Sequence, residues 1–197
     1  MYDMIIAVTG GIGSGKSTLL KIFNDLGYVT LSADAIYADL LRNNQFVELV
    51  SETVGVKPKK EGSVLTLDRE KISEKVFADK SVLNKLDELT HTAIMEEMFR
   101  RAKNSSGIVF CEVPLLFECG YQKSFDQVIV VSRELSVRVD AVTKRDGKTV
   151  EKVKNIIKNQ FDYSKIGNDE HTIIVENDGD ESALRLSAEK ILAEFNN

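Results

Sequence analysis

Brief, uninterrupted apolar runs alternate along the chain with longer stretches in which apolar residues recur at helical spacing. Such runs are typical of strands in a parallel sheet that helices cover on both faces. The pattern predicts strands over residues 4–8, 28–31, 108–113, 127–131 and 172–175. It predicts helices over residues 16–26, 35–41 and 181–195. We therefore expect an α/β fold whose core is a doubly wound parallel sheet of about five strands.

Two stretches interrupt this alternation. Residues 41–105 are mostly helical in pattern, contain no convincing buried strand and are too long for one crossover, which predicts a helical insert. Its nearest approach to a flexible loop is residues 56–63. Residues 133–167 are rich in Lys and Arg and read as two helices broken near Gly147, which is typical of a lid. Both stretches follow strand ends where open α/β sheets bind ligands. The predicted core comprises residues 1–40, 106–132 and 168–197.

Composition narrows the class of protein. Hydrophobic residues make up 43% and charged residues 29%, and the net charge is −5, so nothing attracts the whole chain to nucleic acid or anionic membrane. No apolar run approaches the roughly 20 residues that span a bilayer. Residues 1–8 lack the basic leader of a signal peptide, and Cys111 and Cys119 lack metal-ligand spacing. We expect a cytoplasmic protein without nucleic-acid or membrane partners. We also expect a monomer, although the sequence does not exclude an oligomer.

One motif carries specific chemistry. Residues 10–17 fit the pattern Gly-x4-Gly-Lys-Ser/Thr, and they lie between a predicted buried strand and an amphipathic helix. The glycines allow backbone N–H groups to surround a phosphate chain. Lys16 can reach the β- and γ-phosphates, and the Ser17 hydroxyl can ligate Mg²⁺. The sequence thus predicts a P-loop NTPase fold that binds a nucleoside triphosphate with Mg²⁺. The predicted nucleotide-binding residues of this loop are Gly11, Ile12, Gly13, Ser14, Gly15, Lys16, Ser17 and Thr18.

A P-loop does not define the reaction, and a GTPase switch is one alternative. The string Asn84-Lys85-Leu86-Asp87 matches a guanine-reading motif. It lies, however, in a helical pattern rather than at a strand end. The sequence contains no Asp-x-x-Gly to sense the γ-phosphate. These features favour a kinase.

A kinase needs a carboxylate to accept the proton of the attacking hydroxyl. Asp34, after the second predicted strand, is the candidate for this base, and a helix N-cap is the alternative role. Glu112, at the end of the strand over residues 108–113, can approach Mg²⁺ through water. A loop carboxylate with a local hydrogen bond is the alternative for Glu112.

A kinase also needs mobile cations near the transferring phosphoryl group. Arg145, near the break at Gly147 in the basic stretch, is the candidate, against the alternative of a solvated helix face. From spacing alone, His91 reads more readily as a structural histidine than as a functional one, and so does His171.

Nearly the whole chain resembles the dephospho-coenzyme A kinase (dephospho-CoA kinase) family of the P-loop kinase superfamily. Its strings over residues 6–18 and 112–118 are similar to the two most specific motifs of that family. The remaining matches are Ser32-Ala33-Asp34, Leu67-Asp68-Arg69, Val76-Phe77, His91, Arg145-Asp146, Gln160 and Asn177-Asp178-Gly179.

The resemblance implies ATP-dependent phosphorylation of the ribose 3′-hydroxyl of dephospho-CoA, giving CoA and ADP in the last step of CoA synthesis. It implies that Asp34 is the general base and that Lys16, Arg145 and Mg²⁺ stabilise the phosphoryl group. Asn177 would lie near the adenine of ATP. The residues implied to line the acceptor site are Arg69, His91, Leu115 and Glu118. The implied fold is a P-loop core with a helical CoA-binding domain and a lid.

The chain departs from the family pattern at four positions. Ser32 replaces an Asp, Thr92 replaces a Pro, and Glu112 replaces an Asp. Ala141 stands where the family often has a lid arginine, for which Arg138 is a candidate substitute. These departures bear on local geometry and rate more than on the reaction class. The alternatives left open are another nucleoside or nucleotide kinase and a non-catalytic P-loop module.

Overall fold

The computed structural model describes residues 3–195 of the chain, and these divide into two compact units. The first unit runs up to Leu31 and resumes at Asn104, and the second unit is Ser32–Lys103. The first contains the large sheet and the second is mainly helical. The helix α2 (Ala33–Leu40), which the sequence assigned to the core, lies in the second unit. The predicted boundaries of the insert and of the lid stay predictions.

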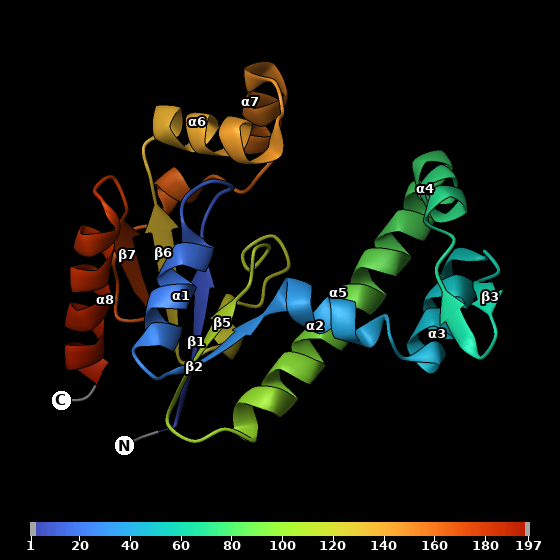
Figure 1. Ribbon diagram of the computed structural model, residues 1–197, viewed down its shortest axis with the longest axis horizontal. Helices are drawn as coiled ribbons and strands as arrows, with labels where there is room; N and C mark the ends of the chain where they lie inside the picture. Colours follow the sequence, from blue (N-terminus) through green and yellow to red (C-terminus); the bar gives the residue numbers. More distant parts are fainter. Residues whose placement is uncertain (1–2, 196–197) are drawn as a thin grey trace. The chain divides into compact units, whose positions relative to one another are not determined.

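The sheet has five strands in the order β2-β5-β1-β6-β7. Their bounds are β1 Met4–Thr9, β2 Val29–Ser32, β5 Ile108–Glu112, β6 Gln127–Ser132 and β7 Thr172–Glu176. The central strand β1 pairs in parallel with β5 and β6, and β6 pairs in parallel with β7. The predicted α/β fold with a five-stranded parallel sheet is confirmed (Figure 1).

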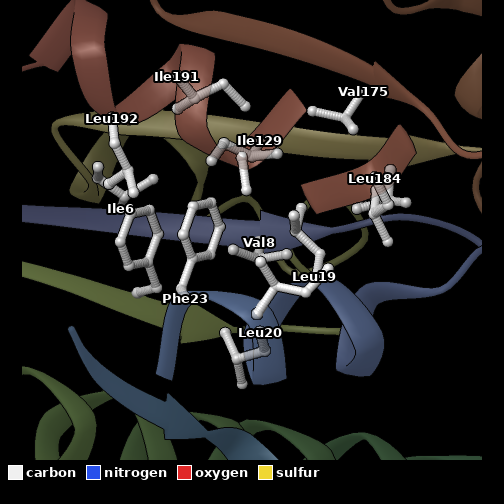
Figure 2. Packing of buried hydrophobic residues seen from close by; sticks show 14 of the residues in the cluster. Ile6, Val8, Leu19, Leu20, Phe23, Ile129, Val175, Leu184, Ile191 and Leu192 are labelled. Atoms are coloured by element: carbon white, nitrogen blue, oxygen red, sulfur yellow. The ribbon is translucent and has the colours of Figure 1, made fainter. Parts of the chain in front are cut away.

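Two helices pack against this sheet through one apolar cluster. They are α1 (Lys16–Asp25) and the closing helix α8 (Glu181–Phe195). Their apolar side chains meet those of β1, β6 and β7, as Figure 2 shows. Phe23 of α1 stacks on Phe110 of β5, with ring centroids 3.7 Å apart. Burial of this cluster fixes the direction in which α1 leaves the sheet, and therefore the position of the loop that precedes it.

The first unit also contains a helix pair, α6 (Leu135–Asp146) and α7 (Val150–Lys158). Gly147 ends α6 with a φ of 63°, so the predicted break near this residue is confirmed. Val139, Val142 and Val153 form a small core between the two helices, and Ile12 packs against it. The pair therefore contacts the loop between β1 and α1.

The second unit contains four helices and a β-hairpin. Besides α2, its elements are α3 Asn44–Val54, β3 Lys59–Glu61, β4 Val64–Thr66, α4 Arg69–Ala78 and α5 Lys80–Lys103. The helices share an apolar core that includes Phe46, Val50 and Ile72. The flexible loop predicted over residues 56–63 is wrong in part, because β3 and the hairpin turn lie there. Both hairpin strands are largely exposed, so they lack the apolar pattern that reveals a strand.

None of the helices within residues 3–195 combines the length and the apolar character needed to cross a membrane.

Candidate functional site

The loop between β1 and α1 has the shape that its glycines permit. Gly13 and Gly15 have backbone φ values of 77° and 100°, which residues other than glycine rarely adopt. A Cβ atom on Gly15 would lie 2.1 Å from Nδ2 of Asn177. Gly15 is also the N-cap of α1, so the loop ends at the positive end of a helix. Such a loop is suited to bind an anionic phosphate chain.

Three side chains from other elements hold this loop from outside. Asn177, just after β7, donates from Nδ2 to the Ser14 carbonyl at 2.8 Å. Arg138 of α6 donates from Nε to the Ile12 carbonyl at 2.9 Å. Gln160, after α7, accepts the Ile12 N–H at 2.9 Å. The loop conformation therefore depends on residues far away in the sequence as well as on its own glycines.

The family resemblance implied that Asn177 lies near adenine, whereas in the structure its side-chain amide donates a hydrogen bond to the phosphate loop. The side chain is buried, and its N–H group is used by the phosphate loop. Contact with adenine stays a prediction for this residue. The supporting roles of Asn177 and Gln160 were missed, because a motif match indicates that a residue matters without indicating which atom it contacts.

A cavity of about 180 Å³ opens on the phosphate loop. Its lining brings the predicted cations Lys16 and Arg145 together with the Ser17 hydroxyl. The Lys16 ammonium donates to the carbonyls of Gly10 and Gly11 at 2.9 and 3.2 Å. The full lining is Gly13, Gly15, Lys16, Ser17, Thr18, Arg133, Ala141, Val142 and Arg145. The arrangement concentrates positive charge and hydrogen-bond donors where a phosphate chain would lie.

Arg145 is held by its sequence neighbour. Its Nε donates to Oδ1 of Asp146 at 2.6 Å, and a terminal nitrogen donates to Oδ2 at 3.2 Å. This bidentate pair raises the pKa of Arg145 and lowers the pKa of Asp146, to which Lys148 also donates. Arg145 thus lines the cavity with its guanidinium oriented by Asp146, and its catalytic role stays a prediction.

Two oxygen-bearing side chains near the phosphate loop, those of Ser17 and Glu112, are suited to a hard cation. The Ser17 hydroxyl donates to Oε1 of Glu112 at 3.0 Å, although the two residues lie 95 positions apart, and both expected roles of Glu112 stay predictions. Within residues 3–195 no group of three or more His, Cys, Asp and Glu side chains gathers to hold a metal. Mg²⁺ is usually bound by one or two carboxylates, waters and substrate phosphates rather than by a full protein cage. The donors at Ser17 and Glu112 therefore fit Mg²⁺ bound together with a nucleotide.

The second unit has its own, larger cavity of about 900 Å³. Asp34 and Arg69 line it together with Tyr37. Burial raises the pKa of Tyr37, and the positive charge of Arg69 offsets part of this increase. The N-cap of α2 is Ser32, so the alternative role of Asp34 as an N-cap does not apply. The remaining lining residues are Ala38, Leu41, Arg42, Val50, Thr66, Leu67, Ile72, Ser73, Val76 and Leu86. This cavity is large, mostly apolar and furnished with a few charged groups, as ligand sites usually are.

The other predicted acceptor residues lie elsewhere. His91 is a half-buried residue of α5 and does not belong to the lining of the larger cavity. Leu115 and Glu118 belong to the first unit, in the segment that follows β5. Oε1 of Glu118 accepts the Phe161 N–H at 3.0 Å. Their contact with an acceptor stays a prediction.

A segment that the sequence did not single out joins the end of β1 to the loop after β5. The Tyr163 hydroxyl lies 3.2 Å from Oγ1 of Thr9 and donates to the Pro114 carbonyl at 3.3 Å. Burial raises the pKa of this tyrosine. Phe161 stacks on Phe117 with ring centroids 4.9 Å apart. The only signal in the sequence was a pair of aromatic residues just after a basic helix, and this signal is not specific.

The string that suggested a GTPase, Asn84 to Asp87, lies within the long helix α5. It therefore occupies no strand end and cannot read a base in the way that a GTPase motif does. The helical interpretation of this string is confirmed.

A model of the family described as dephospho-CoA kinase matches residues 4–182 of this chain. A dephospho-CoA kinase from Fusobacterium nucleatum is 35% identical over 164 residues, which are 82% of this chain and 83% of the relative. A dephospho-CoA kinase from Corynebacterium glutamicum is 31% identical over 196 residues, which are 96% of each chain.

Solved structures with a similar fold include one dephospho-CoA kinase. A crystal structure of a Thermus thermophilus protein superposes with a TM-score of 0.80 at 29% identity and covers 98% of each chain. A dephospho-CoA kinase from Campylobacter jejuni has a TM-score of 0.65 at 27% identity, covering 97% of this chain and 96% of its own. A shikimate kinase from Bacteroides thetaiotaomicron, at 13% identity and a TM-score of 0.55, covers 98% of this chain and 99% of its own and shares the fold alone.

Proposed function

The chain belongs to the dephospho-CoA kinase family, and we propose on this premise that it transfers the γ-phosphoryl group of ATP to the ribose 3′-hydroxyl of dephospho-CoA. The products are CoA and ADP, and the reaction belongs to CoA biosynthesis. The observation that carries the proposal is the cavity on the phosphate loop, where Lys16, Ser17 and Arg145 gather around glycine backbone.

The phosphate loop binds the triphosphate. Backbone N–H groups between Gly11 and Thr18 and the N-terminus of α1 donate to its oxygens. Lys16 exchanges its contacts with the loop carbonyls for contacts with the β- and γ-phosphates. Arg145, oriented by Asp146, adds positive charge on the lid side. Fixed charges of this kind stabilise the transferring phosphoryl group because they need little rearrangement during the reaction.

Asp34 accepts the proton of the 3′-hydroxyl. Support comes from its exposed carboxylate in the first turn of α2 and from the large cavity that it shares with Arg69. The volume of about 900 Å³ lies at the upper end of the range for small-molecule sites, as an acceptor the size of dephospho-CoA requires. Arg69 can pair with the pyrophosphate of this acceptor through its planar guanidinium. Contact of His91, Leu115 and Glu118 with the acceptor stays a prediction of the family resemblance.

Ser17 and Glu112 would hold Mg²⁺, Ser17 directly and Glu112 directly or through water. When bound, the cation neutralises charge on the phosphate oxygens. Among the residues of the chain, Glu112 orients the Ser17 hydroxyl through their hydrogen bond, and Lys16 orients the terminal phosphates of ATP.

The proposal is tested by measuring ADP formation from ATP with dephospho-CoA, with nucleosides, with nucleotides and with no acceptor. Of these acceptors, we expect only dephospho-CoA to support ADP formation from ATP. Mass spectrometry of the product should show one added phosphate on the ribose. Faster turnover with a nucleoside or nucleotide would instead indicate a kinase with a different acceptor. No ADP with any acceptor would indicate a non-catalytic P-loop module and contradict the proposal.

Three further expectations stay predictions: a cytoplasmic location, a monomeric state and the absence of nucleic-acid partners.

A further inference from the structure

At position 141, where the family often has a lid arginine, this chain has an alanine, so another group has to supply that cation. Ala141 lines the cavity on the phosphate loop and carries no charge. Arg138, one turn earlier, was the candidate substitute. Its Nε is bound to the Ile12 carbonyl at 2.9 Å, and a Cβ on Gly11 would lie 2.1 Å from one of its terminal nitrogens. Burial lowers the pKa of Arg138. This arginine supports the loop backbone, and it is not among the residues that line the cavity.

Arg133 is placed differently. It follows β6 directly and lines the same cavity as Lys16, Ala141 and Arg145. Its Nε is buried and has no hydrogen-bond partner among residues 3–195. A buried donor without an acceptor is unfavourable, and in native proteins such a group usually binds a water molecule, an ion or a ligand.

The charge of the cavity indicates which ligand this is. Three cationic side chains line about 180 Å³, and the lining contains no Asp or Glu. Arg145 pairs with the carboxylate of Asp146, which lies outside this lining. Cations gathered in this way repel one another until an anion enters. A guanidinium is well matched to phosphate because its N–H groups can bind two oxygens at once.

We propose that Arg133 binds the phosphate chain of the nucleotide and supplies the cation that Ala141 does not. This inference rests on the proposed function only in assuming a nucleoside triphosphate on the phosphate loop. It adds a third cation to Lys16 and Arg145, and it assigns that cation to the end of β6 rather than to the lid helix α6.

The test measures ATP affinity by isothermal titration calorimetry without any acceptor, for the wild type, Arg133→Met, Arg133→Lys and the control Lys144→Met. Lys144 is an exposed cation of α6 outside the cavity lining. We expect the dissociation constant for ATP to rise about tenfold in Arg133→Met, by a smaller factor in Arg133→Lys, and by less than about twofold in the control. Without ATP, the melting temperature of Arg133→Met should equal or exceed that of the wild type, because no bond is lost and charge repulsion falls.

Two results would overturn the assignment. One is an ATP affinity of Arg133→Met equal to that of Lys144→Met. The other is a lower melting temperature of unliganded Arg133→Met, which would show a structural role. Because no acceptor is present, this test is separate from the proposed reaction. A wild type that binds ATP but does not phosphorylate dephospho-CoA contradicts the reaction and leaves the Arg133 result valid.

Discussion

Two cavities of this protein, the one on the phosphate loop and the large one of the helical unit, are built on different principles. The smaller one, of about 180 Å³, lies on the phosphate loop, and five of its nine lining residues come from the short stretch between Gly13 and Thr18. The larger one, of about 900 Å³, is lined by side chains from α2, α3, β4, α4 and α5. The first depends on backbone N–H groups and positive charge, and the second depends mainly on apolar side chains with a few charged groups.

This difference explains what each cavity can recognise. A backbone cradle binds the phosphate chain that all nucleoside triphosphates share, so it is general in its ligand. A side-chain cavity fits one shape, so it selects the acceptor. An enzyme of this family has two separable functions, which are to bind the phosphoryl donor and to select the acceptor.

The sharpest way to separate the two tasks is Asp34→Asn. We expect turnover to fall about 10³-fold, because the amide cannot accept the proton of the hydroxyl. The affinity for ATP should change by less than about twofold, since this residue belongs to the acceptor cavity. Steady-state kinetics and calorimetry with ATP measure the two effects. The matched control is Asp87→Asn, which removes an exposed carboxylate of the same unit outside the cavity. Full turnover in Asp34→Asn would remove the base assignment.

A second change probes the donor side alone. Glu112→Gln removes a charge beside the Ser17 hydroxyl, and we expect the Mg²⁺ concentration for half-maximal activity to rise about tenfold. Saturating Mg²⁺ should restore most of the activity, and removal of Mg²⁺ with EDTA should abolish it in every variant. Glu170→Gln, another exposed carboxylate of the first unit, serves as the control. An unchanged Mg²⁺ requirement in Glu112→Gln would show that this carboxylate is not near the cation.

The smallest expected effect concerns the stability of the helical unit. Glu97 accepts from Arg100 and Arg101, which lowers its pKa to about 2, and Arg101 also pairs with Asp39 of α2. A carboxylate with a lowered pKa stabilises the folded state above its unfolded pKa of about 4.3, and the contribution is lost as the pH falls toward 2. Glu97→Gln should therefore lower the free energy of unfolding at pH 7 by about 1 kcal/mol.

Urea unfolding from pH 7 down to pH 3 measures this effect. The difference between the wild type and Glu97→Gln should shrink below about pH 4.3, where the unfolded-state glutamate becomes protonated. Glu96→Gln, at an exposed neighbouring position of α5, should behave like the wild type. A difference that stays constant over this pH range would mean that the ion pairs do not account for the stabilisation.

The phosphate loop could be predicted from the sequence because its function depends on eight consecutive residues and on the strand and helix beside them. The supports of the loop could not. Asn177 and Gln160 lie far away in the sequence, and only the fold brings them to Ser14 and Ile12. The hairpin β3–β4 was missed for a different reason: its strands are exposed and carry no apolar pattern.

On the acceptor side, Asp34 could be proposed from its place after a predicted strand, whereas Arg69 was proposed only through the resemblance to a family. Asp34 and Arg69 are separated by 35 positions, and no local spacing relates them, yet both line the larger cavity. The charged residue missed on the donor side, Arg133, carried no signal, because a single arginine after a strand is common. Its significance depends on a cavity that only the folded chain forms.

The most direct test of the division between donor and acceptor cavities is a pair of binding measurements on two variants. Lys16→Met and Arg69→Met are each titrated with ATP and with dephospho-CoA by calorimetry. We predict that Lys16→Met weakens ATP binding at least about tenfold with little change for dephospho-CoA, and that Arg69→Met does the reverse. Arg69→Met with unchanged affinity for dephospho-CoA, or either variant losing both ligands equally, would contradict the division.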